Sequence, residues 1–113
     1  QVERDPLVGG LFENLVVVEA LKSRLNSGRM PNLHFFRDSN RREVDLLYPT
    51  DNGVIPVEIK SAMTYDREFL SGIHYFQKIS TSGIPGWVIY AGELEFEGND
   101  YRVMNYTNAF ELS

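Results

Sequence analysis

The sequence contains no cysteine, so disulfide bonds and thiolate metal ligands are excluded, and this fits a cytoplasmic protein. It has no apolar run long enough to cross a bilayer and no secretory signal peptide. It also lacks a glycine-rich phosphate-binding loop, so nothing in these 113 residues predicts ATP binding. We therefore expect a cytoplasmic globular chain without a membrane span, a disulfide framework or a nucleoside triphosphate site.

Positive charge is also scarce. The chain has 11 Lys and Arg residues against 16 Asp and Glu residues, which gives a net charge of −5 and a pI of about 4.9. This balance argues against strong, non-specific DNA binding, because nucleic-acid binders are usually basic on at least one face. It does not exclude a DNA-cleaving site, since carboxylates around a metal ion add to the negative count and are neutralised by the ion.

The composition is that of one folded domain. Apolar residues make up 42% of the chain and aromatic residues 12%, which is enough for a real core. No repeat or linker divides residues 1–113, so we expect a single domain. The chain opens at Gln1 instead of methionine, and we interpret it as a fragment of a longer protein.

The stretch from Arg41 to Lys60 organises the chain. Polar and apolar residues alternate with period two over 41–48 and 54–60, and Pro49–Gly53 between them has turn chemistry. The pattern predicts a β-hairpin with two distinct faces. One face carries Glu43, Asp45, Leu47, Val54, Pro56, Glu58 and Lys60, and the opposite, core face carries Val44, Leu46, Ile55, Val57 and Ile59.

The predicted register brings two carboxylates together. A loop centred on residues 49–53 places Asp45 beside residue 57 or 58, so its carboxylate would lie about 5 Å from that of Glu58. Two such charges repel by about 3 kcal/mol at an effective dielectric constant of about 20, whereas a divalent cation between them attracts both. Lys60 shares this face, and two acids with a lysine suit metal-assisted attack on a phosphate ester. The alternative is a solvent-facing strand of mixed charge, in which Lys60 pairs with Asp45 or Glu43.

Residues 11–25 are predicted to form the first helix, after a lead-in at Gly9–Gly10 and before a polar stop at Asn26–Gly28. Its apolar residues cover most of its circumference, so we expect it to be buried on more than one side. Glu13 lies among apolar neighbours, where a carboxylate needs a partner. Alternatively, Glu13 lies in the first turn and stabilises the helix dipole. Glu19 is a second candidate for the same role.

The remaining elements follow from the same rules. We predict a strand at Leu33–Arg37, a turn at Asp38–Asn40, a helix at Tyr65–Ile79 capped by Ser61 or Thr64 and ended by Ser82–Gly83, a buried strand at Gly86–Gly92, a hairpin of Glu93–Glu97 and Tyr101–Tyr106, and a helical turn within Thr107–Ser113. The buried strand should run parallel to the second hairpin strand, because a helix connects the two. One stripe of the second helix faces either solvent or a phosphate backbone; it consists of Arg67, Ser71, His74 and Lys78.

The order of these elements and of their acidic residues resembles the PD-(D/E)xK nucleases, the fold of restriction endonucleases and archaeal Holliday-junction resolvases. That family has a glutamate on its first helix, an aspartate at the hairpin and E-x-K on the next strand. The matching residues here are Glu13, Asp45, Glu58 and Lys60. The resemblance covers residues 9–91 and implies an α/β fold with an αβββαβ core, in which helices flank a mixed central sheet, here with an extra C-terminal hairpin.

Four short sequence segments also resemble the C-terminal nuclease-like domain of uncharacterised bacterial and archaeal AAA-type ATPases. The similar segments are Gly10–Val16, Phe36–Asp38, Glu43–Leu47 and Val57–Ser61. In those proteins a P-loop ATPase precedes this domain, so the resemblance implies an N-terminal ATPase domain in the parent chain. ATP hydrolysis itself cannot be assigned to the present residues.

The resemblance implies a site for Mg²⁺ or Mn²⁺, with DNA as the substrate class. Asp45 and Glu58 would hold the ion with help from the Ile59 carbonyl, and Glu13 would orient a metal-bound water or bind a second ion. Lys60 would position the attacking water and stabilise charge on the phosphate. Two other interpretations remain: a catalytically silent module that regulates or assembles the ATPase, and a plain scaffold in which Asp45, Glu58 and Lys60 form a surface ion pair.

Overall fold

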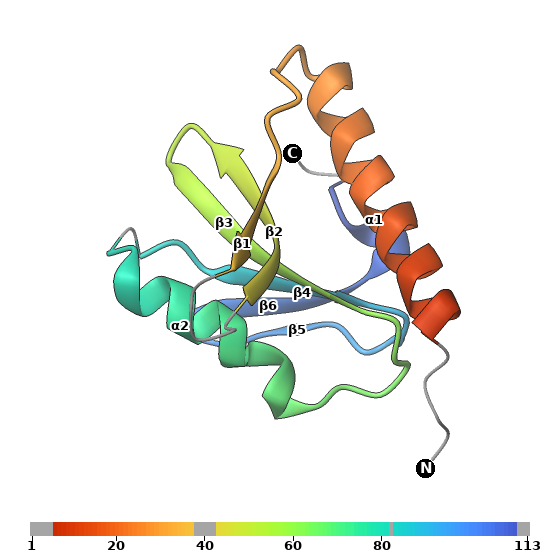
Figure 1. The fold of residues 1–113 in the computed structure, drawn as a ribbon. Helices are drawn as coiled ribbons and strands as arrows, with labels where there is room; N and C mark the ends of the chain where they lie inside the picture. The colour runs from red at the N-terminus through yellow and green to blue at the C-terminus, as the bar shows by residue number, and fades with distance from the viewer. Residues whose placement is uncertain (1–5, 38–42, 82, 111–113) are drawn as a thin grey trace.

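The computed structural model describes residues 6–37, 43–81 and 83–110, and Figure 1 shows how they are arranged. Across these residues, two α-helices and a six-stranded mixed sheet form an α/β fold. The helical elements are α1 (Pro6–Asn26), η1 (Arg67–Leu70), α2 (Ser71–Ile79) and η2 (Tyr106–Asn108), where η denotes a 3₁₀ helix. The strands are β1 (His34–Arg37), β2 (Glu43–Thr50), β3 (Gly53–Lys60), β4 (Gly86–Tyr90), β5 (Phe96–Glu97) and β6 (Tyr101–Asn105), in the spatial order β1-β2-β3-β4-β6-β5.

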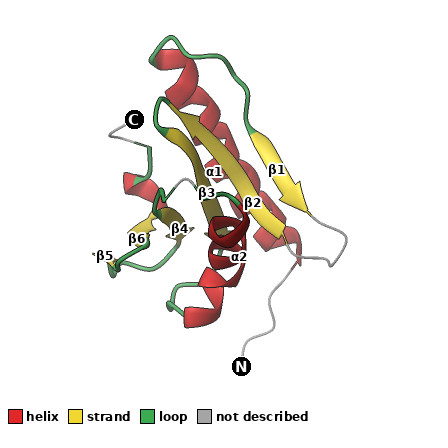
Figure 2. Cartoon of the chain, turned by 90° about the vertical axis from the view of Figure 1, so that its left-hand side faces the viewer, coloured by secondary structure: helices red, strands yellow, loops and turns green. Residues whose placement is uncertain are grey.

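The two α-helices cover opposite faces of the sheet. Figure 2 shows α2 in front of the strands and α1 behind them. On the α1 face, Val16 and Ala20 pack with strand residues into a buried cluster that extends to Phe110. On the α2 face, Ile73 packs with Val88, Tyr90 and other residues into a smaller cluster. The central strands therefore bury one set of alternate side chains against each helix.

The register of the hairpin agrees with the prediction. Leu46 pairs with Val57 and Thr50 pairs with Gly53, so position 45 falls opposite position 58. The five predicted core residues are at most 8% exposed, namely Val44, Leu46, Ile55, Val57 and Ile59. The loop is shorter than predicted, because β2 continues through Pro49 to Thr50. The Thr50 hydroxyl donates to the Gly53 carbonyl at 2.7 Å, and Gly53 supplies a φ of 133° that other residues rarely adopt.

Helix α1 begins five residues before the predicted Leu11, at Pro6. Proline suits the first helical position, where its missing N–H would have no partner, and this start signal outweighs a cost of about 1 kcal/mol for each of the two glycines inside the helix. Glu13 therefore lies about two turns into α1, and its interpretation as a first-turn dipole residue is wrong. The predicted end is confirmed at Asn26, after which Gly28 turns the chain with a φ of 78°.

Helix α1 is buried on one side only, so the prediction of burial around most of its circumference is wrong for this chain. Leu11 is 59% exposed and Leu15 is 45% exposed, with Val18 and Leu25 between these values. Their spacing of four, three and seven residues places them on one helix face. The sheet packs against the other side of α1 together with Tyr106 and Phe110. We call the four exposed residues the α1 stripe.

A buried arginine joins α1 to the hairpin. Arg24 is 4% exposed, and its guanidinium donates hydrogen bonds of 2.7 Å to the Met30 carbonyl, the Asn32 side-chain oxygen and the Pro49 carbonyl. The guanidinium also lies 5.1 Å from the centre of the Tyr48 ring. These acceptors are neutral oxygens, so Arg24 holds the loop after α1 and the end of β2 through charge-assisted hydrogen bonds.

The second helical region starts later than predicted. The 3₁₀ turn η1 precedes α2, and its cap is Asp66, whose carboxylate accepts the Glu68 N–H at 2.9 Å. The predicted caps, Ser61 and Thr64, lie before the helical residues and do not cap them. Asp66 is the cap, because it directly precedes the first turn. The predicted end at Ile79 is confirmed.

The C-terminal half completes the sheet. The predicted parallel strand is β4, which pairs with β3, and the predicted hairpin is the antiparallel pair β5 and β6. The parallel pairing of β6 with β4 was not predicted. The expected helical turn is η2, which begins one residue early. The predictions at 38–42, 82 and 111–113, which include Arg41 and Arg42, lie outside the described residues. None of the described helices is both long and apolar enough to cross a membrane.

Candidate active site

Asp45 lies where strands β2 and β3 leave their regular pairing. Leu46 still pairs with Val57, but one residue further the Asp45 carboxylate accepts the backbone N–H of Ile59 at 2.8 Å. The side chain thus takes the donor that a ladder bond would otherwise use. This hydrogen bond fixes the Asp45 carboxylate against β3, beside Glu58.

Glu58 projects from β3 toward α2 and is 5% exposed. Burial is the main cause that raises the pKa of Glu58 to about 9, and a hydrogen bond with Asp45 and the charge of Asp45 raise it further. The positive charge of Lys60 acts in the opposite direction. These causes favour the protonated form of the Glu58 carboxyl, which can donate a hydrogen bond to Asp45.

Glu13 reaches the Asp45 carboxylate from α1. Burial is the largest cause that raises the pKa of Glu13, followed by the charge of Asp45 and a hydrogen bond with it, while Lys60 lowers this pKa. The partner that the buried setting of Glu13 requires is thus the Asp45 carboxyl. Glu19 is not part of this group, since it lies half exposed on α1 and pairs with Lys22 at 3.4 Å.

Lys60 follows Glu58 by two residues and lies on the same face of β3. Its ammonium lies 5.8 Å from the centre of the Phe69 ring, a cation–π arrangement. Its charge acts on both Glu13 and Glu58. The structure therefore brings the four predicted side chains into one group, although their chemical roles stay predictions.

The oxygen donors of this group fit a hard divalent cation in type. Asp45 and Glu58 offer carboxylates, and the Ile59 carbonyl faces the same neighbouring strand as the Ile59 N–H that binds Asp45. Among the described residues, no three or more His, Cys, Asp or Glu side chains form a ready coordination group. The donor set that fits is two carboxylates and a carbonyl, with Glu13 next to Asp45. The raised pKa of Glu58 favours a bound proton, and a cation that binds the two carboxylates would displace this proton.

Three further residues that were not predicted as site residues lie beside this group or act on it. The charge of Glu43 helps to raise the pKa of Glu13. Phe69 faces Lys60, as described above. Gly72 of α2 lies so close that a Cβ there would overlap the Glu58 carboxylate and the Glu43 carbonyl. A lone glycine within a helical pattern signals close packing, and this signal was available in the sequence.

The stripe of Arg67, Ser71, His74 and Lys78 does not join the carboxylate group. All four side chains are exposed, and His74 lies 3.4 Å from Asp100 on the far side of α2. This exposure agrees with a solvated helix face, and the alternative of a phosphate contact stays a prediction.

The protonation of Glu58 predicts a stability that depends on pH. Its pKa is higher in the folded chain than the ordinary value of 4.5, so its stabilising contribution is complete below about pH 4.5 and is lost as the pH rises toward 9. Glu58→Gln keeps a donor toward Asp45 without a proton to lose. We expect the unfolding free energy of this variant relative to the wild type, in EDTA, to rise by about 3 kcal/mol between pH 6 and pH 8, since each pH unit between the two pKa values corresponds to about 1.4 kcal/mol.

Urea denaturation between pH 6 and pH 9 would measure this difference. Glu19→Gln is the matched control, because it makes the same change at an exposed position of α1. Parallel pH profiles for the wild type and Glu58→Gln would contradict the assignment of a buried, protonated Glu58.

The whole candidate site lies within one family match. Comparison with protein-family models matches residues 8–109 to the family described as "Domain of unknown function (DUF4143)". The chain belongs to this family. Neither the curated proteins nor the solved structures contain a significant match to it. In this DUF4143 chain, the residues from Glu13 on α1 to Gly72 on α2 all fall inside the matched segment.

Proposed function

We propose that this DUF4143 chain is a metal-dependent phosphodiesterase that hydrolyses DNA. The observation that carries the proposal is the pair of buried Glu58 and half-buried Asp45. The Ile59 N–H holds Asp45, and Glu13 and Lys60 join the pair. A pair of close carboxylates is unfavourable unless a proton or a cation neutralises it. A divalent cation is the species that makes such a pair useful for phosphate chemistry.

The order of the elements supports placing this chain with the PD-(D/E)xK nucleases. The run α1, β1, β2, β3, α2, β4 is the αβββαβ order expected from the resemblance. Glu13 comes from the first helix, Asp45 from the second strand, and Glu58 and Lys60 from the third. By the same resemblance, we propose that the chain is the C-terminal domain of an AAA-type ATPase.

Each residue has a role that follows from its position. Asp45 and Glu58, with the Ile59 carbonyl, would hold Mg²⁺ or Mn²⁺, and the ion would supply Lewis-acid activation of water and of the phosphate. Glu13, hydrogen-bonded to Asp45, would orient the attacking water. Lys60 would stabilise the negative charge that develops on the phosphate.

The pKa of Glu58 argues against the plain-scaffold alternative. In a surface ion pair with Lys60, the lysine charge would dominate and lower the pKa of Glu58. Burial and Asp45 instead raise that pKa to about 9. A catalytically silent module with an intact carboxylate group is the second candidate, and it differs from the nuclease in cleavage alone.

Titration with Mn²⁺ by calorimetry at pH 8 tests the proposed metal site. We expect saturable binding to the wild type and at least about tenfold weaker binding to Asp45→Asn, because the amide keeps an acceptor for the Ile59 N–H but loses the charge. Asp51→Asn is the matched control, since this aspartate lies in the hairpin turn with its side chain 90% exposed.

Equal binding by the wild type and Asp45→Asn would overturn the metal site. Binding that depends on Asp45, without cleavage of supercoiled, linear or branched DNA, would instead favour the silent module. Cleavage that requires both Mn²⁺ and Asp45 would support the nuclease.

A further inference from the structure

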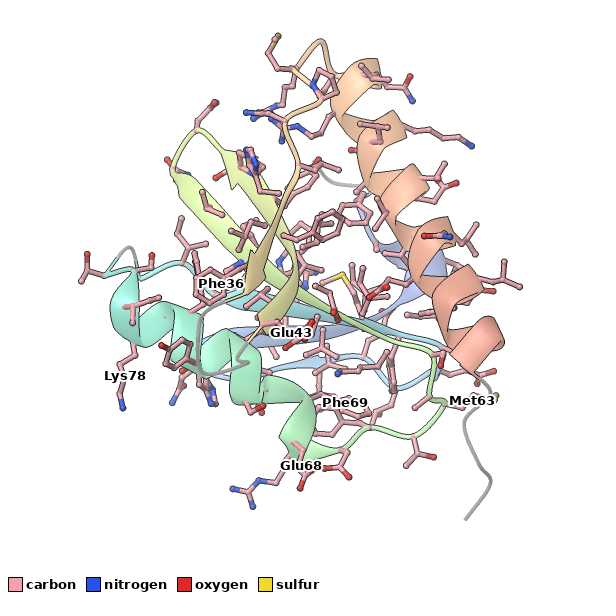
Figure 3. The ribbon with its side chains drawn as sticks, viewed as in Figure 1. Phe36, Glu43, Met63, Glu68, Phe69 and Lys78 are labelled. Carbon is pink, nitrogen blue, oxygen red and sulfur yellow. The ribbon has the colours of Figure 1, made fainter. Side chains whose placement is uncertain are left out.

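The segment from Asp66 to Ile79 lies directly against the candidate site. Within it, Phe69 and Gly72 each contact one residue of the E-x-K strand. The Phe69 ring faces the Lys60 ammonium at 5.8 Å, and Gly72 leaves room for the Glu58 carboxylate. Figure 3 shows Phe69 turned toward the sheet, whereas its neighbour Glu68 points outward.

The spacing of these contacts matches the two elements that make them. Residues 58 and 60 lie on one face of β3, about 6.6 Å apart along the strand. Residues 69 and 72 are three positions apart where η1 runs into α2, so about 5 Å separates them along the helix axis. The two separations are similar, so Gly72 can lie over Glu58 while Phe69 lies over Lys60.

Hydrogen bonds of the capped turn and a second aromatic ring fix the position of Phe69. The Asp66 carboxylate accepts the Glu68 N–H, and the Phe69 N–H donates to the Asp66 carbonyl, both at 2.9 Å. The Tyr65 ring meets the Phe69 ring edge to face at a centroid distance of 5.8 Å. The ring that faces Lys60 is therefore fixed by a capped turn and by a second aromatic residue.

We infer that Phe69 and Gly72 are positioning residues for the proposed hydrolysis. Phe69 orients the Lys60 ammonium through its ring face, and Gly72 admits the Glu58 carboxylate beneath α2 in the orientation that faces Asp45. This inference rests on the proposed function for its catalytic meaning. The two contacts themselves can be tested without any activity.

Phe69 is tested with two substitutions in the 113-residue chain. Phe69→Leu keeps an apolar side chain but removes the ring, and Phe69→Tyr keeps the ring. We expect the ring-current shift of the Lys60 ε-methylene protons, measured by NMR, to vanish in Phe69→Leu and to persist in Phe69→Tyr. With Mn²⁺ and supercoiled plasmid DNA, we expect Phe69→Leu to cleave roughly tenfold more slowly and Phe69→Tyr to cleave at close to the wild-type rate.

Phe36→Leu is the matched control for Phe69→Leu. The Phe36 ring meets the Phe76 ring edge to face at 5.4 Å, so this variant also loses an aromatic contact with α2. It should keep the Lys60 shift and the cleavage rate. Equal cleavage by Phe69→Leu and the wild type, or loss of cleavage by Phe36→Leu to the same degree, would overturn the role of Phe69.

Gly72 is tested by adding a single methyl group. Gly72→Ala should weaken Mn²⁺ binding by roughly tenfold, because the new Cβ displaces the Glu58 carboxylate. Gly10→Ala is the matched control, since a Cβ at this position of α1 would meet nothing within 4 Å, and its Mn²⁺ affinity should equal that of the wild type. Unchanged Mn²⁺ affinity in folded Gly72→Ala would overturn the role of Gly72. If this variant does not fold, the Phe69 series alone decides the inference.

The outcomes separate this inference from the function on which it rests. A wild type that neither binds Mn²⁺ nor cleaves DNA would overturn the proposed function and the catalytic meaning of both contacts together. A wild type that does both, with Phe69→Leu and Gly72→Ala unimpaired, would overturn the present inference alone.

Discussion

Replacing Lys60 by methionine is expected to reduce Mn²⁺-dependent DNA cleavage by at least about 100-fold, which is the usual loss when one donor that stabilises transition-state charge is removed. Methionine preserves the apolar stem beside Phe69 but has no ammonium. Loss of the lysine charge has two opposite effects on ion binding. It raises the pKa of Glu58 further, which weakens binding, and it removes the repulsion between the ammonium and the cation, which strengthens binding. We therefore expect Mn²⁺ affinity to stay within about tenfold of the wild type.

Cleavage rates at saturating Mn²⁺ would measure the effect of Lys60→Met. Lys78→Met is the matched control, because Lys78 is exposed in the last turn of α2. A Lys60→Met variant that cleaves as fast as Lys78→Met would exclude Lys60 from the chemistry. Full retention of metal binding with complete loss of cleavage would separate a nuclease from a silent metal-binding module.

Arg24→Met is expected to lower the free energy of unfolding by about 3–5 kcal/mol, because hydrogen bonds from a charged group contribute about 1.5–3 kcal/mol each and the apolar methionine offsets part of the loss. The substitution removes three charge-assisted hydrogen bonds of 2.7 Å. It also leaves the Met30 and Pro49 carbonyls and the Asn32 side-chain oxygen without that donor, at about 1–3 kcal/mol each when buried. A domain of this size is stable by only about 5–15 kcal/mol, so the loss is a large share.

Urea denaturation monitored by the fluorescence of the single tryptophan, Trp87, would measure the change in stability. Arg29→Met is the matched control five residues along the chain. The Arg29 ion pair with Asp51 spans 3.6 Å at the surface, where such pairs contribute about 1 kcal/mol or less. A loss for Arg24→Met that is no larger than that for Arg29→Met would show that Arg24 is not the link between α1 and the hairpin.

The hairpin and the parallel strand could be predicted because their signals are local. The alternation over 41–60 reports which side chains share a face, and the turn residues between them report the register to within one position. The loop length was overestimated, since Pro49 reads as a turn residue but is tolerated in β2 beyond the end of β1. The start of α1 was predicted too late, because the two glycines at Gly9–Gly10 were interpreted as a lead-in and the start signal of Pro6 was not used.

The candidate site was predictable where it depends on the hairpin and not where it depends on packing between distant elements. The proximity of Asp45 and Glu58 follows from register alone. The role of Glu13 could not be decided from the sequence, because it depended on where α1 begins. The contacts of Phe69 and Gly72 require the crossing of α2 over β3, which no periodicity encodes.

The α1 stripe has a consequence for the colloidal behaviour of the chain. At pH 7 the net charge of −5 keeps copies of the molecule apart by electrostatic repulsion. Near the pI of about 4.9 this repulsion disappears, while the attraction between exposed Leu11, Leu15, Val18 and Leu25 side chains does not. The chain should therefore have a solubility minimum in mild acid that deepens with protein concentration, and a charged residue in place of Leu15 should make it shallower.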